Sequence, residues 1–231
     1  MSTPEKIRSY LFACGLDALA DHIPVVEKAI HDFIAQLGTP MEVSNDALYR
    51  YEVPLLSEDG SCSLIEEMDP LLHDLAKTLG GENESTTRKL KMLNIMVTRA
   101  MMVTGTDWVG IYQRRRGPSG NEMLAKLAYR GRPSRAEFPL KAEFAKGSTN
   151  STVGLSGQAK VIDDVAAYTA EGGGFYVCDD AVQSEICIPI LDDSGAVLGI
   201  IDAEASPKAF FNADRQAAIV AMALVAAALL P

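Results

Sequence analysis

The sequence predicts an α+β fold, in which helices flank an antiparallel sheet and a helical extension precedes it at the N-terminus. Residues 1–84 carry apolar side chains at helical spacing, whereas residues 85–231 contain β-prone segments joined by short turns and bounded by two helical stretches. Strands joined by tight turns pair antiparallel, and the order helix, strands, helix is typical of an α+β domain. We therefore divide the chain into a helical N-terminal region, residues 1–84, and a second domain, residues 85–231.

The charge of the chain is unevenly distributed. The 231 residues carry a formal net charge of -10; residues 1–84 hold 5 Lys and Arg against 16 Asp and Glu, and residues 85–231 hold 16 against 15. Nucleic acids and anionic membranes are bound through Lys and Arg that neutralise phosphates. We therefore expect neither as a partner, and the acidic surplus belongs to the N-terminal region.

The N-terminal region shows two stretches of helical periodicity. Residues 25–37 place apolar side chains at spacings of three and four, and a Gly and a Pro follow. Residues 64–79 repeat the pattern and end at two glycines. Between these predicted helices, residues 48–55 are expected to contain a short extended piece.

The second domain begins with a long helix, which we expect Ser85 to cap and Gly105 to end. Two hairpins follow, because turn-forming residues separate the members of each pair of β-prone segments. The predicted strands are residues 108–113, 123–129, 185–191 and 196–204. Asn212 opens an apolar terminal helix.

The cysteine content and the apolar segments indicate a cytoplasmic protein. Four cysteines are too few for a disulfide scaffold, and no signal peptide is visible in the first residues. The most apolar stretch, residues 217–230, is shorter than the roughly 20 residues of a membrane-spanning helix. We expect it to be a buried helix.

Cys178 is the candidate nucleophile. It lies in a Gly-rich polar loop directly before a predicted strand, and a thiol on an exposed loop held by a rigid scaffold is accessible to reactants. An incidental surface thiol is the alternative. Cys187 alternates with isoleucines and is expected to fill the sheet, while Cys14 and Cys62 have no CxxC partner.

Three carboxylates are expected at one end of the second hairpin. Asp202 and Glu204 share one face of their strand, and Glu185 begins the other strand. A solvated rim is the alternative, although the two acids interrupt an apolar run. Carboxylates disfavour a nearby thiolate by repulsion, so the group makes sense if it binds a cation or acts protonated, as general acids. The three histidines lack metal-ligand spacing, and no metal site is expected.

Three segments together resemble the GAF-domain free methionine-(R)-sulfoxide reductases. They are DWVGIY at 107–112, CDDAVQSEI at 178–186 and GIIDAE at 199–204. The resemblance covers residues 85–231, and it implies a six-stranded antiparallel sheet flanked by helices, a homodimer, and an oxidoreductase without a bound cofactor. The implied reaction is the reduction of free L-methionine-(R)-S-oxide to L-methionine, an antioxidant repair.

The resemblance also assigns roles to residues. Cys178 would attack the sulfoxide sulfur and become a sulfenic acid. The acids Glu185, Asp202 and Glu204 would bind the amino group of free methionine sulfoxide and polarise its S–O bond. Trp108 and Tyr112 would wall the pocket for the S-methyl end.

The chain departs from the family pattern in three places. Residues 153–157 read VGLSG where the family usually has Gly-Val-Cys-Gly, so the resolving cysteine is missing. A second family cysteine falls near Arg135, and Glu204 stands where Asp is usual. We therefore expect an external thiol, such as glutathione or a thioredoxin-like protein, to reduce Cys178, unless Cys14 or Cys62 reaches it. The alternative function is a non-catalytic GAF module that binds a small molecule in signalling.

Overall fold

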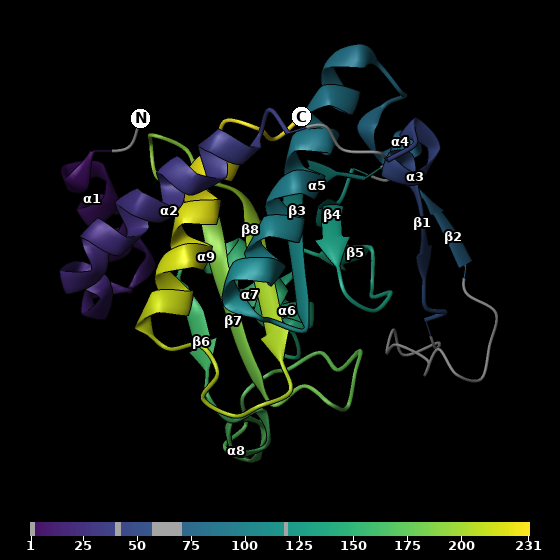
Figure 1. The fold of residues 1–231 in the computed structure, drawn as a ribbon. Helices are drawn as coiled ribbons and strands as arrows, with labels where there is room; N and C mark the ends of the chain where they lie inside the picture. Colours follow the sequence, from purple (N-terminus) through teal and green to yellow (C-terminus); the bar gives the residue numbers. More distant parts are fainter. Residues whose placement is uncertain (1–2, 40–42, 57–70, 118–119) are drawn as a thin grey trace.

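The computed structural model describes residues 3–39, 43–56, 71–117 and 120–231, and its centre is a six-stranded antiparallel sheet (Figure 1). The strands are β3 (Trp108–Arg116), β4 (Glu122–Arg130), β5 (Glu137–Pro139), β6 (Lys160–Ile162), β7 (Ser184–Leu191) and β8 (Val197–Ala205). They lie side by side in the order β5-β4-β3-β8-β7-β6. Both predicted hairpins, β3–β4 and β7–β8, are confirmed, and Gly195 takes the positive φ expected in the second turn.

Helices flank the sheet, which confirms the predicted α+β class. One face is covered by α5 (Glu84–Thr104) and α9 (Ala213–Ala226), and the other by α6 (Ala142–Ala145) and α7 (Thr149–Ser156). A further short helix, α8 (Val165–Ala170), follows β6. Asn212 caps α9 as predicted, and Gly105 ends α5 in the left-handed conformation.

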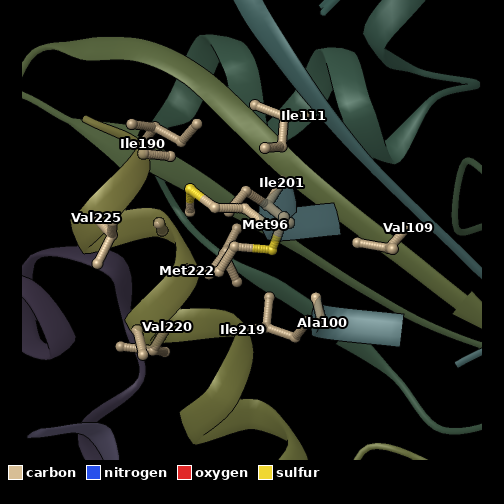
Figure 2. Close-up of a cluster of buried hydrophobic side chains, with 14 of the residues drawn as sticks. Met96, Ala100, Val109, Ile111, Ile190, Ile201, Ile219, Val220, Met222 and Val225 are labelled. Atoms are coloured by element: carbon tan, nitrogen blue, oxygen red, sulfur yellow. The ribbon is translucent and has the colours of Figure 1, made fainter. Parts of the chain in front are cut away.

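The main hydrophobic core lies between the sheet and its two long helices. Figure 2 shows Met96 of α5 and Met222 of α9 meeting Ile201 of β8. The apolar segment expected to form a buried terminal helix is therefore part of this core. Among the described residues, no helix is both long and apolar enough to cross a membrane.

The N-terminal region adds a helical layer and a small ribbon. Its elements are α1 (Pro4–Cys14), the 3-10 helix η1 (Asp17–His22), α2 (Ile23–Gln36), α3 (Asn45–Tyr49), β1 (Arg50–Val53), β2 (Leu71–Asp74) and α4 (Leu75–Leu79). α2 packs along α9, and its buried side chains belong to the same core as α5, α9 and the sheet (Figure 1). β1 and β2 pair antiparallel beside β4, where Tyr51 donates a hydrogen bond to the carbonyl of Lys126.

Two expectations about local structure were wrong. The predicted helix over residues 64–79 is a strand at Leu71–Asp74 and a helix only at Leu75–Leu79, while residues 64–70 lie outside the described part. Leu72 is 66% exposed, so its apolar character does not mark a buried helix face. The cap of α5 is Asn83, whose side chain accepts a hydrogen bond from the backbone N–H of Thr86, and Ser85 already lies inside the helix.

Candidate active site

The face of the sheet opposite α5 and α9, here called the site face, carries most of the predicted site residues. Side chains at paired positions of neighbouring strands project from the same face. Glu185 of β7 pairs with Glu204 of β8, which pairs with Trp108 of β3. One row further along the strands, Cys187 pairs with Asp202, and Asp202 pairs with Gly110. The register therefore brings together the three acids, here called the acid trio (Glu185, Asp202 and Glu204), beside Trp108.

Two glycines make room for the indole ring of Trp108. A Cβ atom at Gly110 would overlap the ring, and one at Gly131 would lie 2.6 Å from its Cδ1 atom. The ring thus lies flat over the backbone of its own strand, and its N–H donates to the carbonyl of Arg132. This explains the glycine in the Trp-x-Gly-x-Tyr segment: a side chain there would displace the indole.

Tyr112 extends the aromatic wall. Its ring centroid lies 6.3 Å from that of Trp108 and 5.5 Å from that of Phe138, and its hydroxyl donates to the carbonyl of Arg135. The ring is buried and belongs to a small apolar cluster on the site face that also includes Ile200 and Cys187. Trp108 and Tyr112 therefore lie side by side on the site face, and their role as a pocket wall stays a prediction.

The acids Glu185 and Asp202 are buried, and only one of the two carboxyl oxygens of each accepts a hydrogen bond from the described part of the chain. They are 1% and 3% exposed. Thr149, from the first turn of α7, donates to one Glu185 oxygen at 2.6 Å, and Asn150 donates to one Asp202 oxygen at 2.9 Å. The second oxygen of each, Glu185 Oε2 and Asp202 Oδ1, is buried, and no hydrogen-bond partner lies near it among the described residues.

Burial raises the pKa of all three acids. Lost hydration is the main cause for Glu185, whose pKa rises well above its usual value, and the charge of Asp202 adds to the rise. Burial also raises the pKa of Asp202, to about 6, against the lowering effect of the hydrogen bond from Asn150. The pKa of Glu204 rises through lost hydration and through the charge of Asp202. Both carboxyls therefore hold a proton to higher pH than an exposed carboxyl does, which suits a group that acts as a general acid.

A metal ion fits this cluster less well than an organic cation. Ligand atoms of Glu185, Cys187 and Asp202 lie within 4.8 Å of one another, close enough for three metal ligands. However, burial and the charges of Asp202 and Glu185 raise the pKa of the Cys187 thiol well above its usual value. A metal binds the thiolate, so Cys187 is better described as a thiol that packs beside the acids.

Three polar residues of the site were not predicted from the sequence. Thr149 and Asn150 follow the Ser148 cap of α7, and no sequence pattern places that helix over the acids. Lys126 is 0% exposed, and the one signal in the sequence was that it interrupts the apolar strand β4. Its register partner on β3 is Tyr112, so it too projects from the site face.

Cys178 lies on the loop between α8 and β7. On either side of it, Tyr176 accepts a hydrogen bond from Arg135 at 2.9 Å, and Asp179 pairs with Arg132 at 3.3 Å. Both arginines belong to the loop after β4 that also covers Trp108. The charge of Asp179 contributes to the raised pKa of Glu204.

The cysteines differ in whether they form a disulfide bond. Cys178 is disulfide-bonded, whereas Cys14 and Cys187 are buried free thiols. Burial raises the pKa of Cys14 to about 12, so this thiol packs in the core rather than serving as a second reactive group. Cys62 lies outside the described residues.

Comparison with known proteins supports the fold. The sequence profile of the GAF domain matches residues 90–229. The chain is similar to a type II free methionine-R-sulfoxide reductase from Thermoplasma acidophilum, with a TM-score of 0.54 and 22% identity over 63% of this chain and 94% of that chain. It is also similar to a free methionine-R-sulfoxide reductase from Neisseria meningitidis in complex with its substrate, with a TM-score of 0.51 and 19% identity over 61% of this chain and 77% of that chain.

A third solved structure, described as a GAF domain, has a TM-score of 0.50 and 16% identity over 84% of this chain and 99% of that chain. No curated protein sequence matches the chain. At these identities the solved structures show the fold alone. The profile covers more than half of the chain and coincides with the six-stranded sheet and its flanking helices α5 and α9, so the chain belongs to the GAF domain family.

Proposed function

We propose that this protein reduces free L-methionine-(R)-S-oxide to L-methionine, with Cys178 as the nucleophile. The observation that carries the proposal is the pair of buried acids, Glu185 and Asp202, each with one unpartnered oxygen, next to the aromatic wall of Trp108 and Tyr112. Unpartnered buried carboxylate oxygens are costly, so a ligand with hydrogen-bond donors is expected to satisfy them.

The ammonium group of a free amino acid meets that requirement. It carries one positive charge and three N–H donors, and the acids offer negative charge in a desolvated place. The S-methyl group of the same molecule is apolar and fits against the rings of Trp108 and Tyr112. A methionine residue inside a protein has no ammonium group, which is why we propose the free amino acid.

The chemistry is an oxygen transfer between two sulfur atoms. The Cys178 thiolate attacks the sulfoxide sulfur while the protonated carboxyl of Glu185 donates a proton to the sulfoxide oxygen. The attack forms an S–S bond between Cys178 and the substrate. The protonated oxygen then moves to the Cys178 sulfur as the S–S bond and the substrate S–O bond break, so the substrate sulfur leaves reduced as the thioether and Cys178 is oxidised to a sulfenic acid. A thiol then condenses with the sulfenic acid, water leaves, and a second thiol reduces the resulting disulfide.

We propose an external thiol, glutathione or a thioredoxin-like protein, as the reductant, and a homodimer in the cytoplasm as the working form. A disulfide at Cys178 has no nucleophilic thiol, so the reduced protein is the active one. The same observation favours the second candidate function, a GAF module that binds a small molecule without turnover.

A turnover assay distinguishes the two functions. Reduced protein is incubated with the R and S epimers of free methionine sulfoxide and dithiothreitol, and methionine is measured by chromatography. We expect wild type to consume the R epimer and Cys178→Ser to lose activity by more than 1000-fold, as for loss of a catalytic nucleophile. Cys14→Ser, at a buried thiol, is the matched control. If wild type forms no more methionine than Cys178→Ser, the reductase function is wrong, and binding without turnover would support the sensor.

A further inference from the structure

Helix α7 lies on the site face against β7 and β8, and its own contacts hold it in place. Its cap Ser148 accepts a hydrogen bond from the N–H of Ser151, and the Ser151 hydroxyl donates to the carbonyl of Pro139 in β5 at 2.9 Å. A Cβ atom at Gly154 would lie 3.1 Å from Leu124 Cδ1 in β4, so the missing side chain lets the helix approach the sheet closely. The first turn of α7 therefore has a fixed position on the sheet.

Two side chains of that first turn are polar and buried. Thr149 is 2% exposed, and its Oγ1 donates to Glu185 Oε1 at 2.6 Å. Asn150 is 4% exposed, and its Nδ2 donates to Asp202 Oδ2 at 2.9 Å. A buried polar group loses its hydration, and apolar side chains of similar size would pack there without that loss. The reaction described above gives these two residues no task, so their place beside both acids calls for one.

The two side chains also contact each other. The Thr149 hydroxyl lies 3.3 Å from Asn150 Oδ1; its single hydrogen is shared between this oxygen and Glu185, with the shorter contact to Glu185. The contact keeps the amide oxygen toward Thr149 and Nδ2 toward Asp202, whereas the reversed amide would set two acceptor oxygens against each other. We call Thr149 and Asn150 the polar bridge, because hydrogen bonds connect the two acids through them.

The polar bridge occupies one oxygen of each acid. No described residue donates to the other oxygen, Glu185 Oε2 or Asp202 Oδ1, although both atoms are buried. While Thr149 donates to Oε1, that oxygen is the acceptor of the carboxyl, so the transferable proton of Glu185 lies on Oε2. In the same way Asn150 occupies Oδ2 and leaves Oδ1 of Asp202 for a donor on the ligand.

We propose that Thr149 and Asn150 are positioning residues for the two buried acids. Thr149 fixes Oε2 as the oxygen from which Glu185 gives its proton to the sulfoxide. Asn150 fixes Oδ1 as the oxygen of Asp202 that accepts the substrate ammonium. After the proton has left, the Thr149 hydroxyl stabilises the Glu185 carboxylate, because a hydrogen bond to a charged acceptor is stronger than one to a neutral acceptor. This inference rests on the proposed function, from which it takes the general acid and the ammonium group.

Steady-state kinetics with free methionine-R-sulfoxide and dithiothreitol test the role of Thr149. Thr149→Val keeps the shape of the side chain and removes the hydroxyl. We expect kcat to fall about 10- to 100-fold, as for a lost hydrogen bond to a charged group, while KM changes by less than about 3-fold. Thr149→Ser restores the hydroxyl and should recover kcat to within about 3-fold of wild type.

Thr152→Val is the matched control for these variants. Thr152 lies about one turn further along α7, and its hydroxyl donates to the carbonyl of Ala145 at 2.8 Å rather than to an acid. We expect this variant to keep the kcat of wild type. An unchanged kcat in Thr149→Val, or a Thr149→Ser variant as impaired as Thr149→Val, would overturn the role of Thr149.

The same kinetics test Asn150 through a different parameter. Asn150→Leu removes the amide and keeps a side chain of similar size. Because Asp202 would then lack the donor that leaves Oδ1 to the ammonium, we expect KM to rise about 10-fold while kcat changes by less than about 3-fold. A fall in kcat at unchanged KM, or no change in either, would overturn the role of Asn150.

A measurement without ligand separates a wrong role for the polar bridge from a wrong function. The full chain is labelled with carbon-13 in its aspartate carboxyls, and NMR follows the Asp202 signal, which is identified by its absence in Asp202→Asn. A hydrogen bond donated to a carboxylate favours the ionised form. The titration midpoint of Asp202, whose pKa is about 6, should therefore rise by about one pH unit in Asn150→Leu. Asn150→Ala, which cannot overfill the position, should raise it in the same direction, and Thr152→Val should not.

The other titratable groups that face Asp202 are the same in all these variants. α7 itself contains no titratable side chain, and the groups on the strands are Glu185 and Cys187 of β7, Glu204 of β8, Tyr112 of β3 and Lys160 of β6. A raised midpoint in Asn150→Leu would support the role of the polar bridge even if methionine sulfoxide is not turned over. An unchanged midpoint in both Asn150 variants would overturn it even if the reductase assay succeeds.

Discussion

The absence of a side chain at Gly110 makes room for the ring of Trp108, the only tryptophan of the chain. Since a Cβ atom there would overlap the Trp108 ring, Gly110→Ala must displace the indole or shift the strand. We expect a loss of about 1–3 kcal/mol in the free energy of unfolding, as for overpacked sites, and a red-shifted tryptophan emission. Urea unfolding followed by fluorescence checks both. Gly38→Ala is the control, because no atom lies within 4 Å of its Cβ position; equal behaviour of the two variants would contradict the account.

We predict that the buried carboxyl of Asp202 lowers the free energy of unfolding at neutral pH, although the proposed reaction requires this group. The pKa of Asp202 is 3.8 in the unfolded chain, and burial raises this pKa to about 6 in the folded protein. Between these values the folded state binds more protons than the unfolded state, so this residue makes stability fall as the pH rises. Asp202→Asn removes that fall and keeps an acceptor for Asn150. We expect the variant to be more stable than wild type at pH 7.5, by up to about 3 kcal/mol, and to lose more than 100-fold in reductase activity.

Urea unfolding at pH 4.5 and 7.5 tests the Asp202 prediction. Asp193→Asn, in the turn of the same hairpin, is the control because its side chain is 96% exposed. An Asp202→Asn variant whose stability falls with pH as steeply as that of wild type would show that Asp202 is not the buried charge described above.

At the scale of elements, the hairpins could be predicted because their information is local. Gly195 and its polar neighbours specify the second turn, and the alternation of β7 and β8 specifies which side chains are buried. The strand at Leu71–Asp74 could not be predicted, because it exists through pairing with β1, a partner some twenty residues earlier in the sequence. Its leucines also repeat at a spacing that fits a helix.

Some residues of the candidate site could likewise be predicted from local sequence, whereas others depend on how distant elements pack. Trp108, Glu185 and Asp202 stand out locally, since a Trp-x-Gly segment and acids inside apolar strands are unusual. Asn150 and Lys126 could not be found from sequence, because their roles depend on where α7 and the ribbon of β1 and β2 pack. A buried lysine moreover contradicts the general preference of lysine for the surface.

Helix α2 gives the element-scale prediction. Ile30 faces α9 and is 4% exposed, whereas Ile34, one turn later, is 45% exposed. Ile30→Ala should lower the free energy of unfolding by about 2–5 kcal/mol, and Ile34→Ala by no more than about 0.5 kcal/mol. Chemical denaturation of both variants measures the difference. Similar values would mean that α2 does not pack on the core as described.

At the scale of the whole molecule, the acidic N-terminal region and the GAF domain share one hydrophobic core. The same region brings Tyr51 to the edge of the site face. Its charge surplus, with 16 acidic residues against 5 basic ones in residues 1–84, therefore accompanies a structural role next to the site. The acids that we propose to take part in the chemistry are the three on the site face, two of which are buried, rather than the many acidic residues of the N-terminal region.

The central claim is that Cys178 takes the oxygen atom of free methionine-R-sulfoxide, and a single turnover without reductant tests it most directly. Fully reduced protein is mixed with excess R epimer, methionine is counted per chain, and Cys178 is examined by mass spectrometry. We predict one methionine per chain and a Cys178 oxidised to sulfenic acid or disulfide, with Cys62→Ser distinguishing these two products. Formation of no methionine, or oxidation at another cysteine while Cys178 stays reduced, would contradict the claim.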